Sequence, residues 1–114
     1  MARNKKTSMT LFQFMNLLIA LLAKNGQYRT MLHYKATLNS YKRFRDNKDI
    51  ALKDIDAEEM RSYEAYLQNI AKVCNNTSSF YLRVLRATYN KAMAKGLVPQ
   101  QNPFKNVYTG IAKT

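Results

Sequence analysis

The sequence is poor in the residues that interrupt secondary structure, with three Gly and two Pro among 114 residues. Such a composition disfavours sandwiches and barrels, whose many turns need these residues. The five are widely spaced, at Gly26, Gly96, Pro99, Pro103 and Gly110. The long stretches between them favour helices. The length is that of one domain, and a hydrophobic fraction of 46% is that of a globular protein.

Cysteine and histidine each occur once, as Cys74 and His33. One cysteine cannot form an internal disulfide, and the two residues together cannot provide a zinc site. We therefore expect no metal and no cofactor, and a reducing cytoplasm suits this composition. Cys74 has no base nearby in sequence, so it is expected to pack rather than to act as a nucleophile.

Acidic residues are absent from residues 1–45 and from residues 65–114, and the formal net charge is +12. The seven acidic residues all lie between these segments, at Asp46, Asp49, Asp54, Asp56, Glu58, Glu59 and Glu64. Two acid-free basic segments around one acidic segment should fold into a molecule with a strongly positive face. Such a face attracts polyanions, which include DNA, RNA and anionic membranes.

The chain has no hydrophobic run long enough to span a membrane. The longest, residues 11–23, would measure about 20 Å as a helix, against a hydrocarbon core of about 30 Å. It also contains Gln13 and Asn16. Basic residues precede this run, as in a signal peptide, but no clean cleavage site follows it. We expect neither export nor membrane insertion.

The first predicted helix runs from Thr10 to about Lys24. Thr10 and Gln13 have the Thr-x-x-Gln spacing of a capping box, and Gly26 suits a left-handed cap after the last turn. Apolar residues cover most of the circumference of this helix. It is therefore expected to be buried between other helices or against a partner.

Two further helices are predicted in the middle of the chain. One runs from about Thr30 to about Asp46, with an apolar stripe at a spacing of three and four residues. The other starts after an Asp56 N-cap and ends near Lys72. Its expected core residues include Met60, Tyr63 and Ile70. Between the two helices, residues 50–55 are expected to form an extended connector whose apolar side chains enter the core.

A fourth helix is predicted to start at a Thr77 cap and to end near Lys95, before Gly96. Residues 1–9 are polar and basic and are expected to be flexible. The tail after the fourth helix is expected to be extended and anchored by Phe104. The sequence thus predicts an all-α fold, a compact bundle of four main helices.

The fourth helix and the segment after it resemble a known family. The stretch Asn76-Thr-Ser-Ser-Phe-Tyr-Leu-Arg-Val-Leu-Arg-Ala-Thr-Tyr-Asn-Lys-Ala, followed by Gly96-Leu-Val and Asn102-Pro-Phe104, is similar to the end of the SAM-like core-binding domain of tyrosine recombinases, the phage-type integrases. The spacings Tyr34-x6-Tyr41-x2-Phe44 and Tyr63-x2-Tyr66-Leu67 resemble the second and third helices of that domain. The resemblance covers about residues 8–108 and is greatest to integrases of mobile elements from Bacteroides-type bacteria.

The resemblance implies an N-terminal domain that forms half of a clamp around duplex DNA in a bacterial cytoplasm. Residues 10–104 would be this domain, residues 1–9 a basic arm, and residues 105–114 the start of a linker to a catalytic domain. The implied partners are double-stranded DNA, that catalytic domain and neighbouring recombinase protomers. No catalytic motif of the family is matched, so the segment itself is expected to have no enzymatic activity, and none of its tyrosines is assigned as nucleophile.

Polar and basic residues at helical spacing identify a candidate DNA-binding surface on the second and fourth helices. In the fourth helix, Thr77, Ser78 and Ser79 crowd an amino end that favours phosphate. The remaining candidates on the second helix are Arg29, Thr30, His33 and Thr37, with the more lateral Lys35, Asn39, Lys42 and Arg43, and those on the fourth helix are Arg83, Arg86 and Asn90. Arg and Asn are residue types that read guanine and adenine edges, whereas His33 lacks the partners that a metal ligand or an acid–base catalyst needs.

Two other functions remain open. A protein-interaction module would use the apolar first helix to contact a partner. A membrane-surface protein would use the same helix after its basic arm, although an interfacial helix prefers its charges on its own polar face. An enzyme has the least support, because the sequence offers no carboxylate pair, metal cluster, phosphate loop or nucleophile–base pair.

Overall fold

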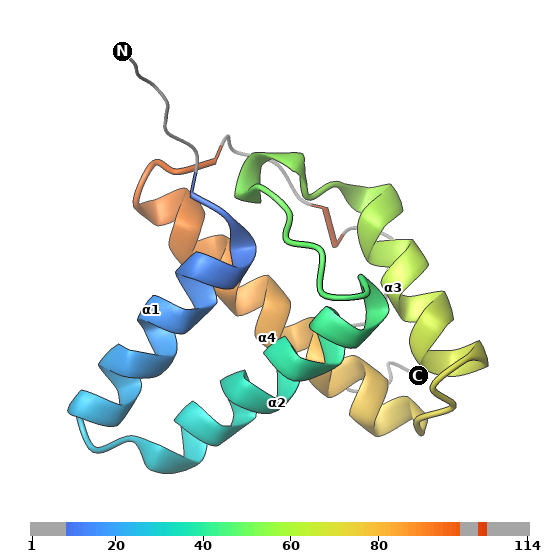
Figure 1. Ribbon diagram of the computed structural model, residues 1–114, viewed down its shortest axis with the longest axis horizontal. Coiled ribbons are helices and arrows are strands. Elements are labelled where there is room, and N and C mark those ends of the chain that lie inside the picture. The colour runs from blue at the N-terminus through green and yellow to red at the C-terminus, as the bar shows by residue number, and fades with distance from the viewer. Residues whose placement is uncertain (1–8, 99–102, 105–114) are drawn as a thin grey trace, which may run out of the picture.

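The computed structural model describes residues 9–98 and 103–104. They form four α-helices, α1 (Leu11–Lys24), α2 (Tyr28–Phe44), α3 (Ala57–Asn69) and α4 (Asn75–Ala94), and a 3-10 turn, η2 (Leu52–Asp54), shown in Figure 1. No strand occurs in these residues, whose one β-type pairing is an isolated bridge between Thr10 and Ala51. The predicted all-α, four-helix fold is confirmed. The predictions for residues 1–8 and 105–114 lie outside the described part.

Local cap chemistry sets both ends of α1. The Gln13 amide donates to Thr10 Oγ1 and the Thr10 amide donates to Gln13 Oε1, each at 3.2 Å, which is the predicted capping box. After the last turn, Gly26 has φ of 78°, and the Gln27 amide donates to the Leu22 carbonyl at 2.9 Å. This six-to-one bond is part of a Schellman motif, so the predicted left-handed cap is confirmed.

Two helices start earlier than predicted. Helix α2 begins at Tyr28, two residues before Thr30. Helix α4 begins at Asn75, because Cys74 has an extended backbone, with φ of −71° and ψ of 165°, and its carbonyl accepts the first intrahelical bond, from Ser78 N at 2.9 Å. Cys74 is therefore the N-cap residue, and the prediction of a Thr77 cap is wrong.

The connector between α2 and α3 is also more compact than predicted. It contains the η2 turn instead of a fully extended segment. Its apolar side chains nevertheless enter the core as expected, since Leu52 and Ile55 are buried. The Leu11 amide donates to the Ile50 carbonyl at 2.8 Å, which joins this connector to the start of α1.

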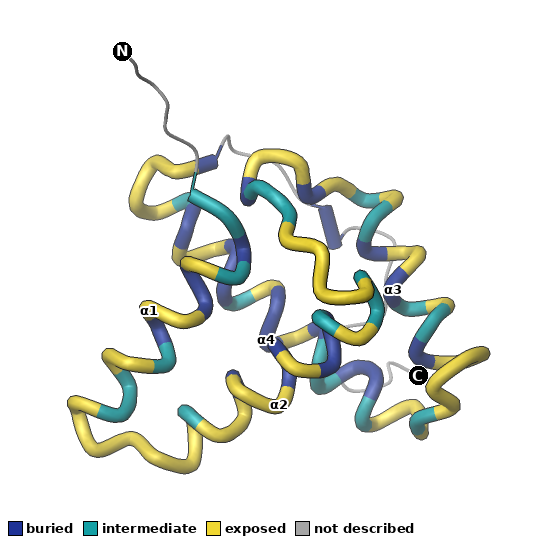
Figure 2. The backbone as a smooth tube through the Cα atoms, viewed as in Figure 1, coloured by how far each residue is buried: buried dark blue, intermediate teal, exposed yellow. Residues whose placement is uncertain are grey.

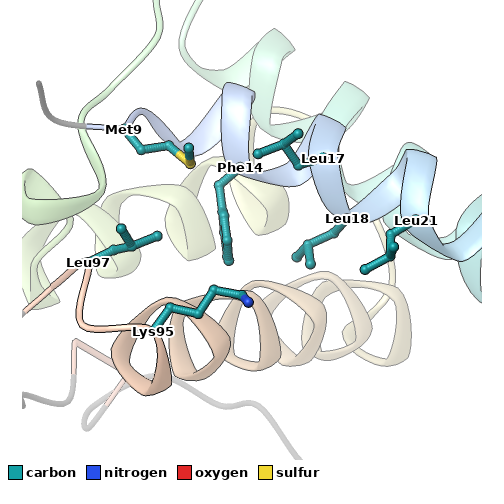
Figure 3. A pocket seen from close by; sticks show the side chains of 7 residues that line it. All are labelled: Met9, Phe14, Leu17, Leu18, Leu21, Lys95 and Leu97. Atoms are coloured by element: carbon teal, nitrogen blue, oxygen red, sulfur yellow. The ribbon is translucent and has the colours of Figure 1, made fainter.

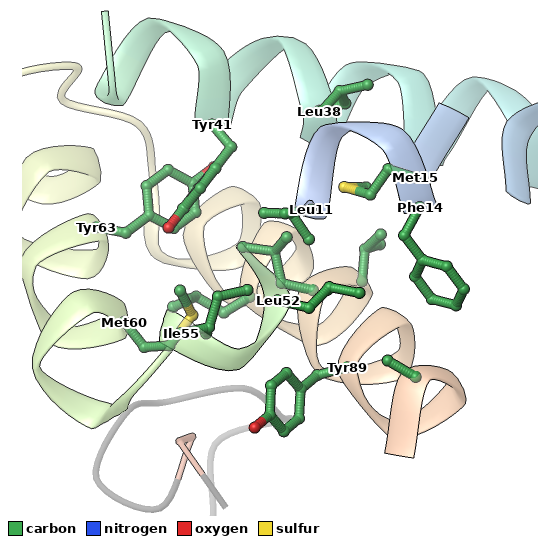
Figure 4. Close-up of a cluster of buried hydrophobic side chains, with 14 of the residues drawn as sticks. Leu11, Phe14, Met15, Leu38, Tyr41, Leu52, Ile55, Met60, Tyr63 and Tyr89 are labelled. Carbon is green, nitrogen blue, oxygen red and sulfur yellow. The ribbon is translucent and has the colours of Figure 1, made fainter. Parts of the chain in front are cut away.

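The core lies where α1, α2, α3 and α4 converge on the connector (Figures 2 and 4). Large side chains dominate it, and Tyr41, Tyr63 and Tyr89 are fully buried. Ile70, predicted to be a core residue, is instead 72% exposed. Helix α3 ends at Asn69, so Ile70 is the C-cap residue and lies beyond the face that Leu67 buries.

Helix α1 is only partly covered by the described helices, so of the two expectations, burial between other helices or against a partner, the first holds for one side of the helix only. Phe14, Met15 and Leu18 enter the core, whereas Leu17 and Leu21 are 56% and 54% exposed. The described helices therefore pack on one side of α1 and leave an apolar outer side.

A polar network joins α2 to α3 inside this core. Ser40 Oγ and Tyr63 Oη lie 2.6 Å apart, and Tyr41 Oη donates to Glu59 Oε2. The Arg45 guanidinium also donates to Glu59 Oε2, at 2.6 Å. Burial raises the pKa of the Tyr41 hydroxyl, and the Glu59 carboxylate raises it further. Burial also raises the pKa of Tyr63, against a smaller lowering by the Ser40 hydrogen bond.

Candidate nucleic-acid interface

The outer face of α2 carries cations without acidic residues. Arg29, Lys35 and Arg43 are exposed, and α2 contains no Asp or Glu. In residues 9–98 and 103–104, none of these three cations forms an ion pair, since the pair found there joins Arg45 to Glu59. The outer face of α2 therefore presents unneutralised positive charge.

Helix α4 presents a second acid-free face. Asn76, Arg83 and Asn90 are exposed and follow one another at seven-residue intervals. Seven residues are nearly two turns, so the three side chains lie close to one line, each about 10 Å from the next. Arg86 is exposed about 60° around the helix from Arg83. Sequence reasoning missed Asn76 because it began the helix at Thr77, although the seven-residue spacing was visible.

The two faces adjoin. The rings of His33 on α2 and Phe80 on α4 meet edge to face, with centroids 5.0 Å apart. Lys91 Nζ of α4 lies 3.3 Å from Tyr34 Oη of α2 and 5.3 Å from the centre of that ring. Residues one turn from the His33–Phe80 contact therefore belong to neighbouring surfaces. The joined surface, here called the basic face, comprises Arg29, His33, Asn76, Arg83, Arg86 and Asn90.

The acidic residues lie outside α2 and α4, and several stabilise the fold. Asp49 Oδ1 accepts hydrogen bonds from Phe12 N at 3.2 Å and Ile50 N at 2.8 Å. Asp56 caps α3 by accepting from Glu59 N at 2.8 Å. Glu59 itself is held in the network with Tyr41 and Arg45. These three carboxylates serve local contacts in the connector and α3, which leaves the positive charge of α2 and α4 unopposed.

Three predicted contact residues are buried, which corrects their assignment. Thr37 is fully buried, and its hydroxyl donates to the His33 carbonyl one turn earlier, at 2.9 Å. Ser78 and Ser79 are buried, and Ser79 Oγ donates to the Asn76 carbonyl at 3.1 Å. Their hydroxyls point into the protein because core packing rotates α2 and α4 that way, so they are removed from the candidate interface.

Other predicted residues lie at the margins of the basic face. Lys42 Nζ is 5.5 Å from the centre of the Phe12 ring, so this half-buried side chain extends toward α1. Lys35 lies two turns earlier on the same edge of α2. Thr30 is exposed in the first turn of α2, and Thr77 is half-buried in the first turn of α4.

The start of α4 offers donors beside the basic face. The first helical amides, of Asn75, Asn76 and Thr77, have no intrahelical acceptor. Cys74 is exposed, and its Sγ lies 3.2 Å from Thr77 Oγ1. Hydrogen bonding from Thr77 lowers the pKa of this thiol. The first turn of α4 thus exposes Asn75 and Asn76, whereas Ser78 and Ser79, predicted to crowd this end, are buried.

An apolar groove lies between α1 and the end of α4 (Figure 3). It has a volume of about 410 Å³ and is lined by Met9, Phe14, Leu17, Leu18, Leu21, Lys95 and Leu97. Leu97 is 40% exposed, and side chains of α1, with Phe14 and Leu18 directed toward α4, form the opposite wall. Lys95 supplies the charged group of the lining.

Neither a membrane span nor a metal cluster is found in the part of the chain that the structure describes. None of its helices has the length and apolar character to cross a bilayer. No three His, Cys, Asp or Glu side chains of residues 9–98 and 103–104 are grouped so that they could hold a metal ion.

Comparison with known proteins identifies the family. No curated protein and no solved structure matches the chain. The sequence does match the family described as phage integrase SAM-like domain over residues 10–109, which is most of its length. The match coincides with the helical bundle and agrees with the resemblance found in the fourth helix. The chain belongs to the phage integrase SAM-like domain family.

Proposed function

We propose that this domain binds duplex DNA as the clamp domain of a tyrosine recombinase and contacts core-site DNA in the cytoplasm during integration or recombination. The observation that carries the proposal is the basic face. It joins exposed arginine and asparagine side chains of two helices that contain no acidic residue. Phosphate contacts supply most of the affinity of such surfaces, and arginine and asparagine also recognise base edges in the major groove.

Each part of the basic face has a role in this proposal. Arg29 and Arg86 bind phosphates on the flanks, while Arg83 and Asn90 follow the groove. The amides at the start of α4, beside Asn76, donate to a further phosphate oxygen. His33 lies where the two helices meet, within reach of the DNA that these side chains bind.

The rest of the protein follows from the same proposal. Residues 10–104 form the core-binding domain, residues 1–9 a basic arm, and residues 105–114 lead toward a catalytic domain of the same chain. That domain, not this one, would carry the tyrosine nucleophile. Neighbouring recombinase protomers are the further partners.

The test is binding of a 20-base-pair duplex, measured by fluorescence anisotropy at low salt. The double variant Arg83→Ala/Arg86→Ala should bind about tenfold more weakly, equivalent to about 1.4 kcal/mol, with an unchanged helical circular dichroism spectrum. The matched control is Lys53→Ala/Arg61→Ala, which removes two exposed cations from η2 and α3. Equal weakening of both variants would show that total charge, not the basic face, governs binding.

A second function, protein–protein contact, is favoured by the apolar groove. Leu17, Leu21 and Leu97 are each at least 40% exposed beside it. Light scattering without DNA distinguishes the two functions. A stable dimer that does not bind DNA would support protein contact, whereas a monomer that binds DNA supports the clamp.

A further inference from the structure

The middle of the outer face of α2 carries an apolar side chain that the core does not use. Leu32 is 57% exposed, and Tyr28, one turn earlier, is 60% exposed. Both lie on a helix without acidic residues in a chain of net charge +12. Exposed side chains of this size usually serve an interface when they lie together on one face.

Cations flank Leu32 symmetrically. Arg29 precedes it by three residues and Lys35 follows it by three, and both are exposed. At 3.6 residues per turn, the two cations project about 60° to either side of Leu32 and lie about 4.5 Å before and after it along the axis. Leu32 therefore occupies the midline of a face whose two edges are positive.

This arrangement matches the cross-section of a major groove. The groove is about 12 Å wide, which accommodates one helix, and phosphates line both of its walls. A helix whose two edges carry cations places its midline toward the base edges. The apolar group exposed there is the C5 methyl of thymine, which apolar side chains contact without hydrogen bonding.

Two polar residues continue the same midline. Asn39 and Arg43 are exposed and project within about 20° of the direction of Leu32. The sequence predicted a more lateral position for them, but burial of Tyr34, Leu38 and Tyr41 turns this side of α2 outward. Asparagine pairs with adenine and arginine with guanine, so the midline as a whole offers base-reading chemistry while its edges offer phosphate binding.

We infer that Leu32 contacts a thymine methyl group in the major groove and gives this domain a preference for DNA that carries a methyl at that position. The inference rests on the proposed DNA binding and adds the specificity-determining residue. A protein partner is a weaker fit to this face, because a partner would have to neutralise Arg29, Lys35 and Arg43 around one leucine.

The experiment removes the apolar group from each partner in turn, first the C5 methyl from the DNA and then the Leu32 side chain from the protein. Alternating dA–dT duplexes of 20 base pairs are compared with duplexes in which every thymine is replaced by uracil, which lacks only the C5 methyl. The protein should bind the thymine duplex about fourfold more tightly for each buried methyl. Leu32→Ala should bind both duplexes alike, at the affinity that the original protein has for the uracil duplex.

Ile70→Ala is the matched control, since it truncates an exposed aliphatic side chain at the end of α3. It should keep the thymine preference. A second probe pair, alternating dG–dC duplexes with and without 5-methylcytosine, places a methyl at the same position of the groove and should give a preference of the same sign.

The possible outcomes distinguish failure of the Leu32 contact from failure of the proposed DNA-clamp function. Tight binding to both duplexes with no thymine preference would refute the Leu32 contact and leave the clamp function standing. A thymine preference that survives Leu32→Ala would also refute it, because another group would then read the methyl. Failure to bind any duplex at low salt would remove the clamp function and the inference together.

Discussion

Glu59 holds the junction of α2 and α3, and its removal should destabilise the domain measurably. Its carboxylate accepts hydrogen bonds from the buried Tyr41 hydroxyl and from the Arg45 guanidinium, the latter at 2.6 Å. Glu59→Ala leaves the Tyr41 hydroxyl without its acceptor, at a cost of about 1–3 kcal/mol. The ion pair adds less than about 1 kcal/mol, because the Arg45 and Glu59 side chains are 23% and 17% exposed.

The expected total is a loss of about 1–4 kcal/mol in the free energy of unfolding. For a domain of about 100 residues, each 1 kcal/mol lowers the melting temperature by about 4–8 °C. The decrease should therefore lie between about 4 and 32 °C, measured by circular dichroism. Glu59→Gln keeps an acceptor oxygen for Tyr41 and should lose less than half as much.

A double-mutant cycle isolates the contact. Tyr41→Phe removes the hydroxyl and keeps the buried ring, so Glu59→Ala should cost less in that background than in the original protein. Equal costs in the two backgrounds would refute the hydrogen bond as the origin of the effect. DNA binding by the folded Glu59→Gln variant should be unchanged, because Glu59 lies outside the basic face.

Three further predictions concern stability and association. Burial raises the pKa values of Tyr41 and Tyr63 in the folded protein. The stability that these two neutral tyrosines contribute is therefore fully present below the pKa of tyrosine in the unfolded chain, about 10, and is lost as the pH rises above it. Above that pH the free energy of unfolding should fall by about 2.7 kcal/mol per pH unit for the two tyrosines together. Urea titration at each pH measures this decrease and tyrosinate absorbance measures the ionisation; a free energy that does not change with pH would contradict the burial of the two hydroxyls. Gly96→Ala should cost about 1 kcal/mol, because Gly96 has φ of 76° while nothing lies within 4 Å of an added Cβ; a larger loss in chemical denaturation would mean an unseen contact. Leu17→Ser/Leu21→Ser should reduce any self-association seen by light scattering and leave DNA affinity within twofold; a parallel loss of DNA binding would place α1 in the DNA interface.

The features that the sequence predicted correctly are those set by neighbouring residues. The Thr10–Gln13 capping box and the Asp56 cap depend on side chains that bond amides three residues away. Gly26 adopts the left-handed turn that ends α1 because glycine has no Cβ to oppose a positive φ. Such local chemistry is readable without knowing what the helix packs against.

The features that the sequence did not predict depend on packing between helices. Thr37 was assigned to the DNA surface as a polar residue, yet it lies three and four residues from the buried Tyr34 and Tyr41 and shares their face. Ser78 and Ser79 likewise face the core, where small side chains allow close approach of the helix. Polarity alone does not determine which way a helix is rotated; the positions of its largest buried side chains do.

The start of α4 shows how one boundary affects a site. The sequence predicted Thr77 as the cap because threonine caps helices often. With Cys74 as the cap, Asn76 joins the line of Arg83 and Asn90, and the free amides move toward Asn75. The candidate residues of the helix interior were unaffected.

The most direct test of the central claim is the salt dependence of duplex binding. If the basic face makes four to six phosphate contacts, a plot of log K against log salt should have a slope of about −4 to −5. Arg83→Ala/Arg86→Ala should make this slope shallower by about two units, and Lys53→Ala/Arg61→Ala should leave it unchanged. An affinity that does not vary with salt, or a slope that the Arg83/Arg86 variant does not change, would contradict the account.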